Sequence, residues 1–104
     1  MRLPRERLDD LLHDKWDQRV SLRDLAVATG LHEVTISKFF PVYFLCTFVE
    51  YMRRLKIEKS LQMIKTSSDS LTNIAMDCGF SDQSHFTRTF KHLTGLLPNQ
   101  YAKL

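Results

Sequence analysis

The sequence predicts an all-α fold of about seven helices, and three observations lead to this fold class. Apolar residues recur at helical spacing along most of the 104 residues. Capping residues and glycines mark where helical segments begin and end. No segment has the strict apolar and polar alternation of a half-buried strand. The hydrophobic content of 43% is ordinary for a globular fold, and the length suits one domain or two small joined ones.

Capping residues mark three helices in the first part of the chain. Pro4 opens a segment whose apolar residues lie at helical spacing: Leu8, Leu11, Leu12 and Trp16. Ser21, with Asp24 three residues later, has the spacing of a cap before a second helix, which Gly30 should close. A third helix should begin near Glu33.

The longest helix is expected next. Thr47 and Glu50 have the T-x-x-E spacing of a capping box, and the helix that they open extends to about Thr66. Its apolar residues form a stripe: Phe48, Tyr51, Met52, Leu55, Leu61 and Ile64.

Three shorter helices should complete the chain. Ser70 caps the first of them and Gly79 ends it. The second runs from about residue 82 to Gly95, and Pro98 opens the third. Every expected element is therefore a helix.

One structural unit occurs twice in the sequence. The pattern of residues 21–31 recurs in residues 70–80, and after a one-residue insertion the pattern of residues 36–40 recurs in residues 86–90. Each copy combines a short helix that carries an alanine, a turn opened by glycine, and a second helix with polar residues on one face. This is the pattern of a helix-turn-helix, whose second helix, the recognition helix, can lie in a major groove of DNA.

The repeat divides the chain into three parts. Residues 1–46 and 67–104 are expected to form two helix-turn-helix subdomains, joined by a long linker helix over residues 47–66. A helix of roughly 20 residues is about 30 Å long, close to the ~34 Å between successive major-groove faces of B-DNA. One molecule could therefore read two adjacent major grooves from the same side of the duplex.

The net charge of +3 hides an uneven distribution, because the excess of basic residues lies in the middle of the chain. Residues 37–67 carry six Lys or Arg against two Asp or Glu. Such an excess indicates an anionic partner such as nucleic acid, although a solvated helix face would have the same composition.

The sequence predicts no cofactor, no metal site and no membrane contact. Four dispersed histidines and the distant pair Cys46 and Cys78, both expected to be buried, lack the spacing of a zinc site. The eleven uncharged residues from Phe39 to Val49 are too few to span a bilayer. Charges near the start of the chain occupy the place where a signal peptide needs an apolar run, so a cytoplasmic location is expected.

The segment IAMDCGFSDQSHFTRTFKHLTGLLPNQY contains an Ala-x-x-x-Gly-Phe-x-Asp turn, a Phe-x-Arg-x-Phe-Lys helix, then Gly-x-x-Pro and a Tyr. It resembles the signature of the AraC/XylS family of transcription regulators, and the resemblance extends over about residues 5–102. It implies two helix-turn-helix subdomains on a linker helix that bind double-stranded DNA near promoters, usually to activate transcription. It further implies RNA polymerase as a partner, with a sensor domain at the N-terminal side or a homodimer partner.

The resemblance also implies which residues of the second unit face DNA: Gln83, Ser84, His85, Thr87 and Arg88. Gln can pair bidentately with adenine and Arg with guanine, each discriminating by about 1–3 kcal/mol. Ordinary exposed helix residues would give the same pattern. Lys91, one turn after Arg88, is expected to contact a phosphate rather than a base.

In the first unit the matching positions are His32, Glu33, Val34, Ser37 and Lys38. Val34 could contact a thymine methyl group, and Lys38 a guanine or a phosphate. Glu33 is expected to stabilise the helix N-terminus instead. The other four residues are the predicted DNA contacts of the first unit.

The segment FPVYFLC, residues 40–46, departs from the family pattern, in which basic residues and a glycine turn follow the phenylalanine. Pro41 removes a backbone donor and should end or kink the first recognition helix at Phe40. Leu45 occupies the usual glycine position, where a positive φ would be strained. Missing basic residues would weaken phosphate binding, and exposed aromatic residues would form an apolar patch.

The sequence favours one of three functions. Sequence-specific DNA binding for transcription regulation is the leading hypothesis. The alternative is a protein-interaction module whose first helix-turn-helix has lost base reading and docks a sensor domain, a second copy or RNA polymerase. Some DNA-repair alkyltransferases carry a similar DNA-binding module, but they need a cysteine metal cluster that this sequence lacks, so no enzyme is expected.

Overall fold

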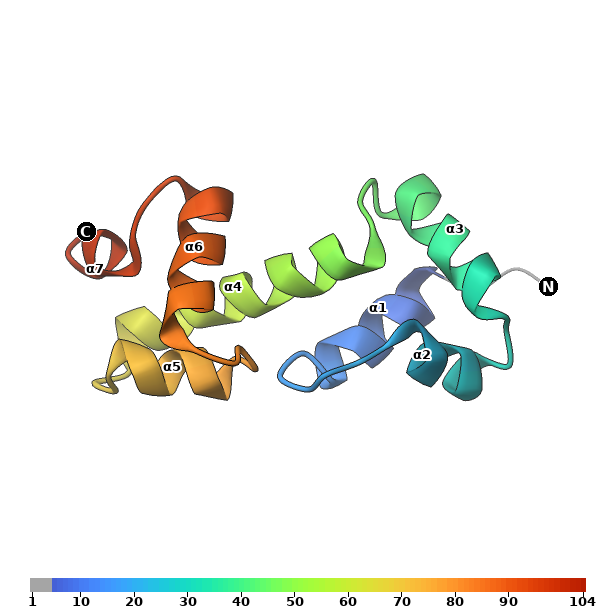
Figure 1. Ribbon diagram of the computed structural model, residues 1–104, viewed down its shortest axis with the longest axis horizontal. Helices are drawn as coiled ribbons and strands as arrows, with labels where there is room; N and C mark the ends of the chain where they lie inside the picture. Colours follow the sequence, from blue (N-terminus) through green and yellow to red (C-terminus); the bar gives the residue numbers. More distant parts are fainter. Residues whose placement is uncertain (1–4) are drawn as a thin grey trace. The chain divides into compact units, whose positions relative to one another are not determined.

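A computed structural model describes residues 5–104 (Figure 1). Side chains are described from Leu8 onward. Residues 5–104 contain seven α-helices and no strand, which confirms the predicted fold class. The predicted helix start at Pro4 lies outside the described residues. No helix in this range combines the length and the apolar composition that crossing a membrane requires. The helices are α1 (Arg5–Asp14), α2 (Leu22–Thr29), α3 (Glu33–Tyr43), α4 (Phe48–Thr66), α5 (Leu71–Asp77), α6 (Gln83–Thr94) and α7 (Pro98–Ala102).

The chain forms two compact units, which are described separately. Residues up to Met52 belong to the first unit and Arg53–Leu104 form the second, so the boundary falls inside α4. Each unit buries one cysteine, Cys46 in the first and Cys78 in the second, as the sequence predicts.

The core of the first unit joins α1, α2 and α3 to the start of α4. α2 packs against α3. The Phe40 ring packs edge-on against the rings of Phe48 and Tyr51, with centroids 5.3 and 5.6 Å away, so the start of α4 is fixed on α3. Five side chains with almost no exposed surface form the centre of this core: Leu8, Leu12, Leu25, Ile36 and Phe40.

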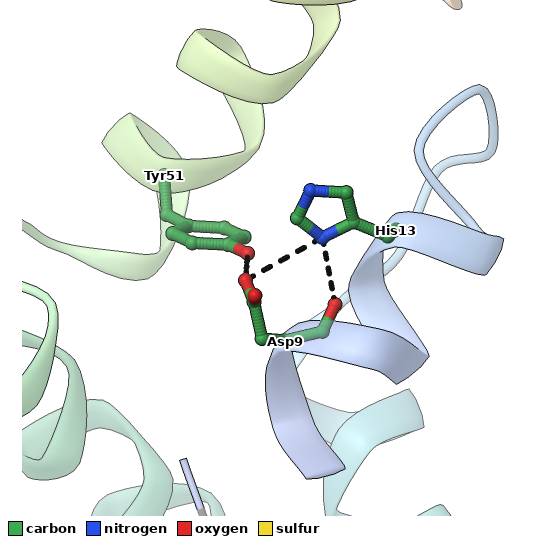
Figure 2. Close-up of polar contacts among 3 residues, drawn as sticks. All are labelled: Asp9, His13 and Tyr51. Carbon is green, nitrogen blue, oxygen red and sulfur yellow. Dashed lines mark hydrogen bonds and ion pairs between the residues drawn. The ribbon is translucent and has the colours of Figure 1, made fainter. Parts of the chain in front are cut away.

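A polar cluster joins α1 to the start of α4 (Figure 2). The hydroxyl of Tyr51 donates a hydrogen bond to the carboxylate of Asp9. Nδ1 of His13 lies 2.9 Å from the backbone carbonyl oxygen of Asp9 and 3.4 Å from its carboxylate. The cluster therefore orients Tyr51, whose ring also supports α3, and holds α1 against α4 within the first unit.

In the second unit, α5 packs against α6 and α6 against α7. A row of aromatic rings runs through this unit from the turn before α6 to α7. The centroid distances are 5.3 Å from Phe80 to Phe86, 5.7 Å from Phe86 to Phe90 and 5.9 Å from Phe90 to Tyr101. The row anchors the buried side of α6 at both of its ends.

Side-chain caps fix where several helices begin. The Ser21 hydroxyl accepts a hydrogen bond from the backbone N–H of Asp24, whose carboxylate accepts one from the N–H of Ser21, at 3.1 and 2.9 Å. Thr47 and Glu50 make the same reciprocal pair at 3.2 Å in each direction. Ser70 caps α5. These three predicted caps are therefore confirmed.

The end of α3 differs from the sequence prediction. α3 continues through Pro41 to Tyr43, so the predicted early end at Phe40 is wrong. Pro41 removes one donor, but the N–H of Phe44 still donates to the carbonyl oxygen of Phe40 at 2.8 Å. The rings of Phe39 and Tyr43, one turn apart, stack with centroids 4.2 Å apart and stabilise this last turn.

Beyond α3, the chain adopts the strained backbone predicted at the usual glycine position. Leu45 has a φ of 60°, the one positive φ of a non-glycine residue in the described range. The predicted patch of exposed aromatic residues is wrong, because Tyr43 and Phe44 are half-buried against neighbouring rings. The exposed side chains of this segment are aliphatic: Val42 (69%), Leu45 (85%) and Val49 (53%).

Candidate nucleic-acid interface

The turn between α5 and α6 fixes where the second recognition helix begins. Gly79 has a φ of 86°, and the N–H of Phe80 donates to the carbonyl oxygen of Ala75 at 3.0 Å. Ala75 has no exposed surface, so only a small side chain fits where α5 meets α6. Asp82 then caps α6, because its carboxylate accepts a hydrogen bond from the N–H of His85 at 2.7 Å.

α6 has a buried face and an exposed face. Phe86 and Phe90 are fully buried. Four of the predicted DNA contacts on the opposite face are exposed: Gln83, Ser84, Arg88 and Lys91. Thr87 belongs to the same face and is half-buried. The helix therefore presents donors and acceptors on one side while its other side is fixed in the core.

One side chain of this exposed face is held by α5. The hydroxyl of Thr72 donates a hydrogen bond to Oε1 of Gln83 at 2.5 Å. Thr72 is absent from the contacts predicted from the sequence. A comparison of the two repeats could have drawn attention to Thr72, because the first unit has Arg23 at the matching position.

His85 lies at the edge of the exposed face. Its imidazole packs edge-on against the ring of Phe80, with centroids 5.2 Å apart and planes at 78°. His85 is half-buried as a result. Part of the imidazole surface is therefore taken up by the turn, and the rest remains accessible to a ligand.

α3 presents the predicted contacts of the first unit in the same way. Val34, Ser37 and Lys38 are exposed, whereas Ile36 and Phe40 have no exposed surface. The spacing of exposed and buried residues along α3 therefore matches that along α6.

The N-terminus of α3 has a weaker cap than that of α6. His32 is the N-cap residue and is exposed, and its side chain makes no capping hydrogen bond with the described residues. Glu33 is exposed in the first turn, where its charge is favourable to the helix dipole. The charge of Glu33 opposes a phosphate close to its own carboxylate, while the exposed imidazole of His32 remains accessible.

Charge distinguishes the two recognition helices. α6 carries Arg88 and Lys91 and no acidic residue between its first and last positions. α3 carries Lys38 and Glu33, whose charges offset each other. The exposed face of α6 is therefore the more favourable one for a polyanion.

Two helix pairs, each with a left-handed glycine turn and an exposed polar face on its second helix, define a helix-turn-helix DNA-binding domain. A family model described as a helix-turn-helix domain matches residues 25–104. The chain belongs to the AraC-type family of helix-turn-helix DNA-binding domains of transcription regulators, as its resemblance to that family predicts.

Two curated relatives show how far the sequence similarity extends. The chain is 30% identical over 89 residues to the HTH-type transcriptional activator RhaS of Escherichia fergusonii, with 86% of this chain and 32% of RhaS covered. It is 23% identical over 93 residues to the uncharacterized HTH-type transcriptional regulator YisR of Bacillus subtilis, with 89% of this chain and 32% of YisR covered. The chain thus spans about a third of the length of these relatives.

Solved structures have the same fold. A transcriptional regulator from Chromobacterium violaceum with an AraC-type DNA-binding domain matches with a TM-score of 0.86 at 22% identity, covering 91% of this chain and 85% of that one. The DNA-binding domain of AdpA, crystallised in complex with a target DNA, matches with a TM-score of 0.86 at 15% identity, covering 94% and 88%. The family consists of DNA-binding regulators rather than enzymes, as predicted.

Proposed function

We propose that this chain binds specific sites on double-stranded DNA and regulates transcription by inserting α3 and α6 into adjacent major grooves. The observation that carries the proposal is the exposed face of α6, where Gln83, Arg88 and Lys91 lie opposite two buried phenylalanines. A helix with this division presents hydrogen-bonding groups to base edges while its core side holds it in place.

The residues of α6 have different proposed roles. Arg88 reads a guanine and Gln83 reads a neighbouring base, since both side chains are long, exposed and able to donate hydrogen bonds. Ser84 and Thr87 contact base edges or phosphates with their hydroxyl groups. Lys91 contacts a phosphate. His85, which is partly covered by Phe80, contributes a backbone contact at most.

α3 is the second proposed reading helix. Val34 contacts a thymine methyl group, Lys38 contacts a guanine or a phosphate, and Ser37 adds a hydrogen bond. His32 lies before the first turn of α3, where it contacts the DNA backbone. Because Glu33 opposes phosphates, this helix contributes less to affinity than α6.

The proposed arrangement assigns residues 1–46 and 67–104 to two helix-turn-helix subdomains and residues 47–66 to a linker. α4 has 19 residues, which corresponds to about 28 Å at 1.5 Å per residue. This length is close to the ~34 Å between successive major-groove faces and supports binding to one side of the duplex by one molecule.

Activation is the proposed outcome, with RNA polymerase as the protein partner. The support for activation is the similarity to RhaS, which is named a transcriptional activator. Since the relatives are about three times as long as the matched region, the proposal includes a sensor domain at the N-terminal side of this domain, or a homodimer partner.

A second candidate function is protein docking by the first unit, which the exposed aliphatic side chains of Val42, Leu45 and Val49 favour. In that case the first helix-turn-helix has lost base reading and binds a sensor domain, a second copy or RNA polymerase. The salt dependence of the affinity distinguishes the two functions. DNA binding releases counterions and weakens as the salt concentration rises, whereas apolar docking does not weaken in this way.

Selection from a random pool of DNA duplexes, followed by affinity measurements at several salt concentrations, tests the leading proposal. We expect one enriched site with two half-sites about 10 base pairs apart, and an affinity that falls steeply with salt. A pool without any enriched sequence contradicts sequence-specific binding. A single enriched half-site restricts base reading to one helix and favours the docking role for the other unit.

A further inference from the structure

We propose that Thr72 of α5 is a positioning residue that fixes the carboxamide of Gln83 and thereby sets which base α6 prefers. The inference rests on the proposed function, because it concerns the exposed face of α6. Thr72 itself would not contact the base. It would act through Gln83, whose orientation it determines.

The hydrogen bond between the two residues carries the inference. Thr72 donates to Oε1 of Gln83 at 2.5 Å, across the two helices of the second helix-turn-helix. Both residues are exposed, so burial does not restrain the glutamine. An exposed glutamine otherwise samples many rotamers, and ordering it on DNA would reduce the affinity. The bond from Thr72 removes part of that freedom before DNA is bound.

The direction of the bond has a chemical consequence. With Oε1 accepting from Thr72, one of its two lone pairs is occupied and its direction is fixed, whereas both N–H groups of Nε2 remain available to donate. Guanine presents two acceptors in the major groove, N7 and O6, whereas adenine presents the acceptor N7 and the donor N6. The bidentate pair of glutamine with adenine needs Oε1 to accept a second hydrogen bond, from N6, while Thr72 restrains its direction. Held in this way, Gln83 should prefer guanine to adenine.

The first unit shows that the arrangement is not a general feature of the repeat. Arg23 and Glu33 occupy the positions of Thr72 and Gln83 in that unit. Within the described part of the chain, no hydrogen bond or ion pair joins the side chains of these two residues. The hydrogen-bonded pair of uncharged residues, Thr72 and Gln83, is therefore specific to the second unit, which also has the more basic recognition helix.

Two substitutions at Thr72 test the role of its hydroxyl. Thr72→Val removes the hydroxyl at nearly constant shape, and Thr72→Ser keeps it. The affinity of each protein is measured for the four base pairs at the position where Gln83→Ala loses discrimination. We expect Thr72→Val to shift the guanine-to-adenine preference towards adenine by about fivefold, the equivalent of one hydrogen bond. Thr72→Ser should keep the preference of the wild type.

A double substitution separates positioning from direct contact. In the Gln83→Ala background, Thr72→Val should have no further effect on affinity or preference. An equal loss of affinity for all sequences that persists in that background would show that Thr72 contacts a phosphate itself, and would overturn the inference. An unchanged base preference in a folded Thr72→Val protein that still selects its site would also overturn it.

A measurement without DNA keeps the inference independent of the binding assay. NMR relaxation of the Gln83 side-chain amide should show restricted motion in the wild type and in Thr72→Ser, and faster motion in Thr72→Val. Equal motion in all three proteins overturns the positioning role even where DNA binding is intact. Restricted motion in a wild-type protein that selects no DNA sequence would instead refute the proposed function and leave the side-chain contact standing.

Discussion

The two recognition helices, α3 and α6, share their buried sides and differ in their exposed sides and ends. Phe40 packs on Tyr51 with centroids 5.6 Å apart and rings at 66°, and Phe90 packs on Tyr101 at 5.9 Å and 61°. Both units therefore fix the second helix of the motif by the same aromatic contact. The backbone of a helix-turn-helix depends on this core, and the exposed residues can vary without changing it.

The N-terminal ends show the first difference. The carboxylate of Asp82 accepts a hydrogen bond from a backbone N–H of α6, an interaction that typically contributes about 1 kcal/mol. His32 makes no such bond at the start of α3 with the described residues. The first turn of α6, which carries Gln83 and Ser84, is therefore held more firmly than the matching turn of α3.

The C-terminal ends show the second difference. Gly95 follows α6 with a φ of 81°, and Leu45 has a φ of 60° at the equivalent place after α3. A branched side chain costs about 1–2 kcal/mol in this conformation, which glycine adopts freely. Where α6 has Lys91, α3 has Pro41. The first unit thus adopts a left-handed residue here without the glycine that favours it, and it lacks the lysine that can contact a phosphate.

The largest expected effect is a difference between α6 and α3 in how much each contributes to affinity and base preference. Arg88→Ala should reduce the affinity for the selected site by about 1–3 kcal/mol and relax the preference at one base pair. Lys38→Ala, at the matching position of α3, should cost less and affect all sequences more evenly. Binding curves on the selected duplex and on four single-base variants would measure both losses.

The Arg88→Ala and Lys38→Ala variants also test whether these residues are correctly assigned as base-reading residues. Unchanged affinity and preference in a folded Arg88→Ala protein would remove Arg88 from the reading residues. Equal and base-specific losses in both variants would mean that the two helices read DNA alike, and the contrast between the units would then apply to their ends alone.

The second expected effect concerns stability. Ala75 has no exposed surface, whereas Ala26, its counterpart in the first unit, is half-buried. Ala75→Leu should overpack the approach of α5 to α6 and lower the free energy of unfolding by about 1–3 kcal/mol. Ala26→Leu should lower it by less, because part of the larger side chain can point into solvent. Thermal unfolding of both variants would test this order, and a reversed order would contradict the tighter packing of the second unit.

The third prediction restores the features that the first unit lacks. Pro41→Lys combined with Leu45→Gly should strengthen non-specific DNA binding and raise the salt slope by about one unit, because one more phosphate is neutralised. Pro41→Gln combined with Leu45→Gly is the matched control, since it changes the backbone in the same way without adding charge. Equal slopes for the two double variants would show that residue 41 lies away from the DNA.

Local sequence patterns predicted much of the fold, and side-chain packing between elements accounts for what they missed. Capping residues such as Ser21 and Thr47 act within one turn, so their partners can be read from spacing. α3 continues through Pro41, and the stacking of Phe39 on Tyr43 and the hydrogen bond from the N–H of Phe44 to the carbonyl oxygen of Phe40 both support its last turn. The low helix propensity of proline, taken alone, does not account for contacts between neighbouring side chains.

The candidate site shows the same division. The exposed face of α6 follows from helical periodicity once Phe86 and Phe90 are placed in the core. The bond from Thr72 to Gln83 joins residues eleven positions apart on two helices, so it depends on how α5 packs against α6. Neither periodicity nor capping patterns contain that information.

The smallest expected effect compares the caps of the two leading helices, α2 and α5. Hydrogen bonds from Ser21, first from its backbone N–H and then from its side chain, hold the pKa of Asp24 below its ordinary value of 3.8. The second unit has the uncharged Asn73 at the matching position, beside the cap Ser70. Of these two leading helices, only α2 should therefore have a cap whose strength depends on pH in the acidic range.

Because the folded-state pKa of Asp24 is lowered, its contribution to stability is fully present above pH 3.8 and is lost as the pH falls below that value through the folded pKa. Asp24→Asn should therefore unfold at a lower temperature than the wild type at neutral pH, and the difference should shrink below pH 3.8. Asn73→Asp should give the cap of α5 the same acid sensitivity. Unfolding temperatures measured between neutral and acidic pH would test this prediction. If the difference between Asp24→Asn and the wild type stays constant with pH, the carboxylate charge contributes nothing to this cap.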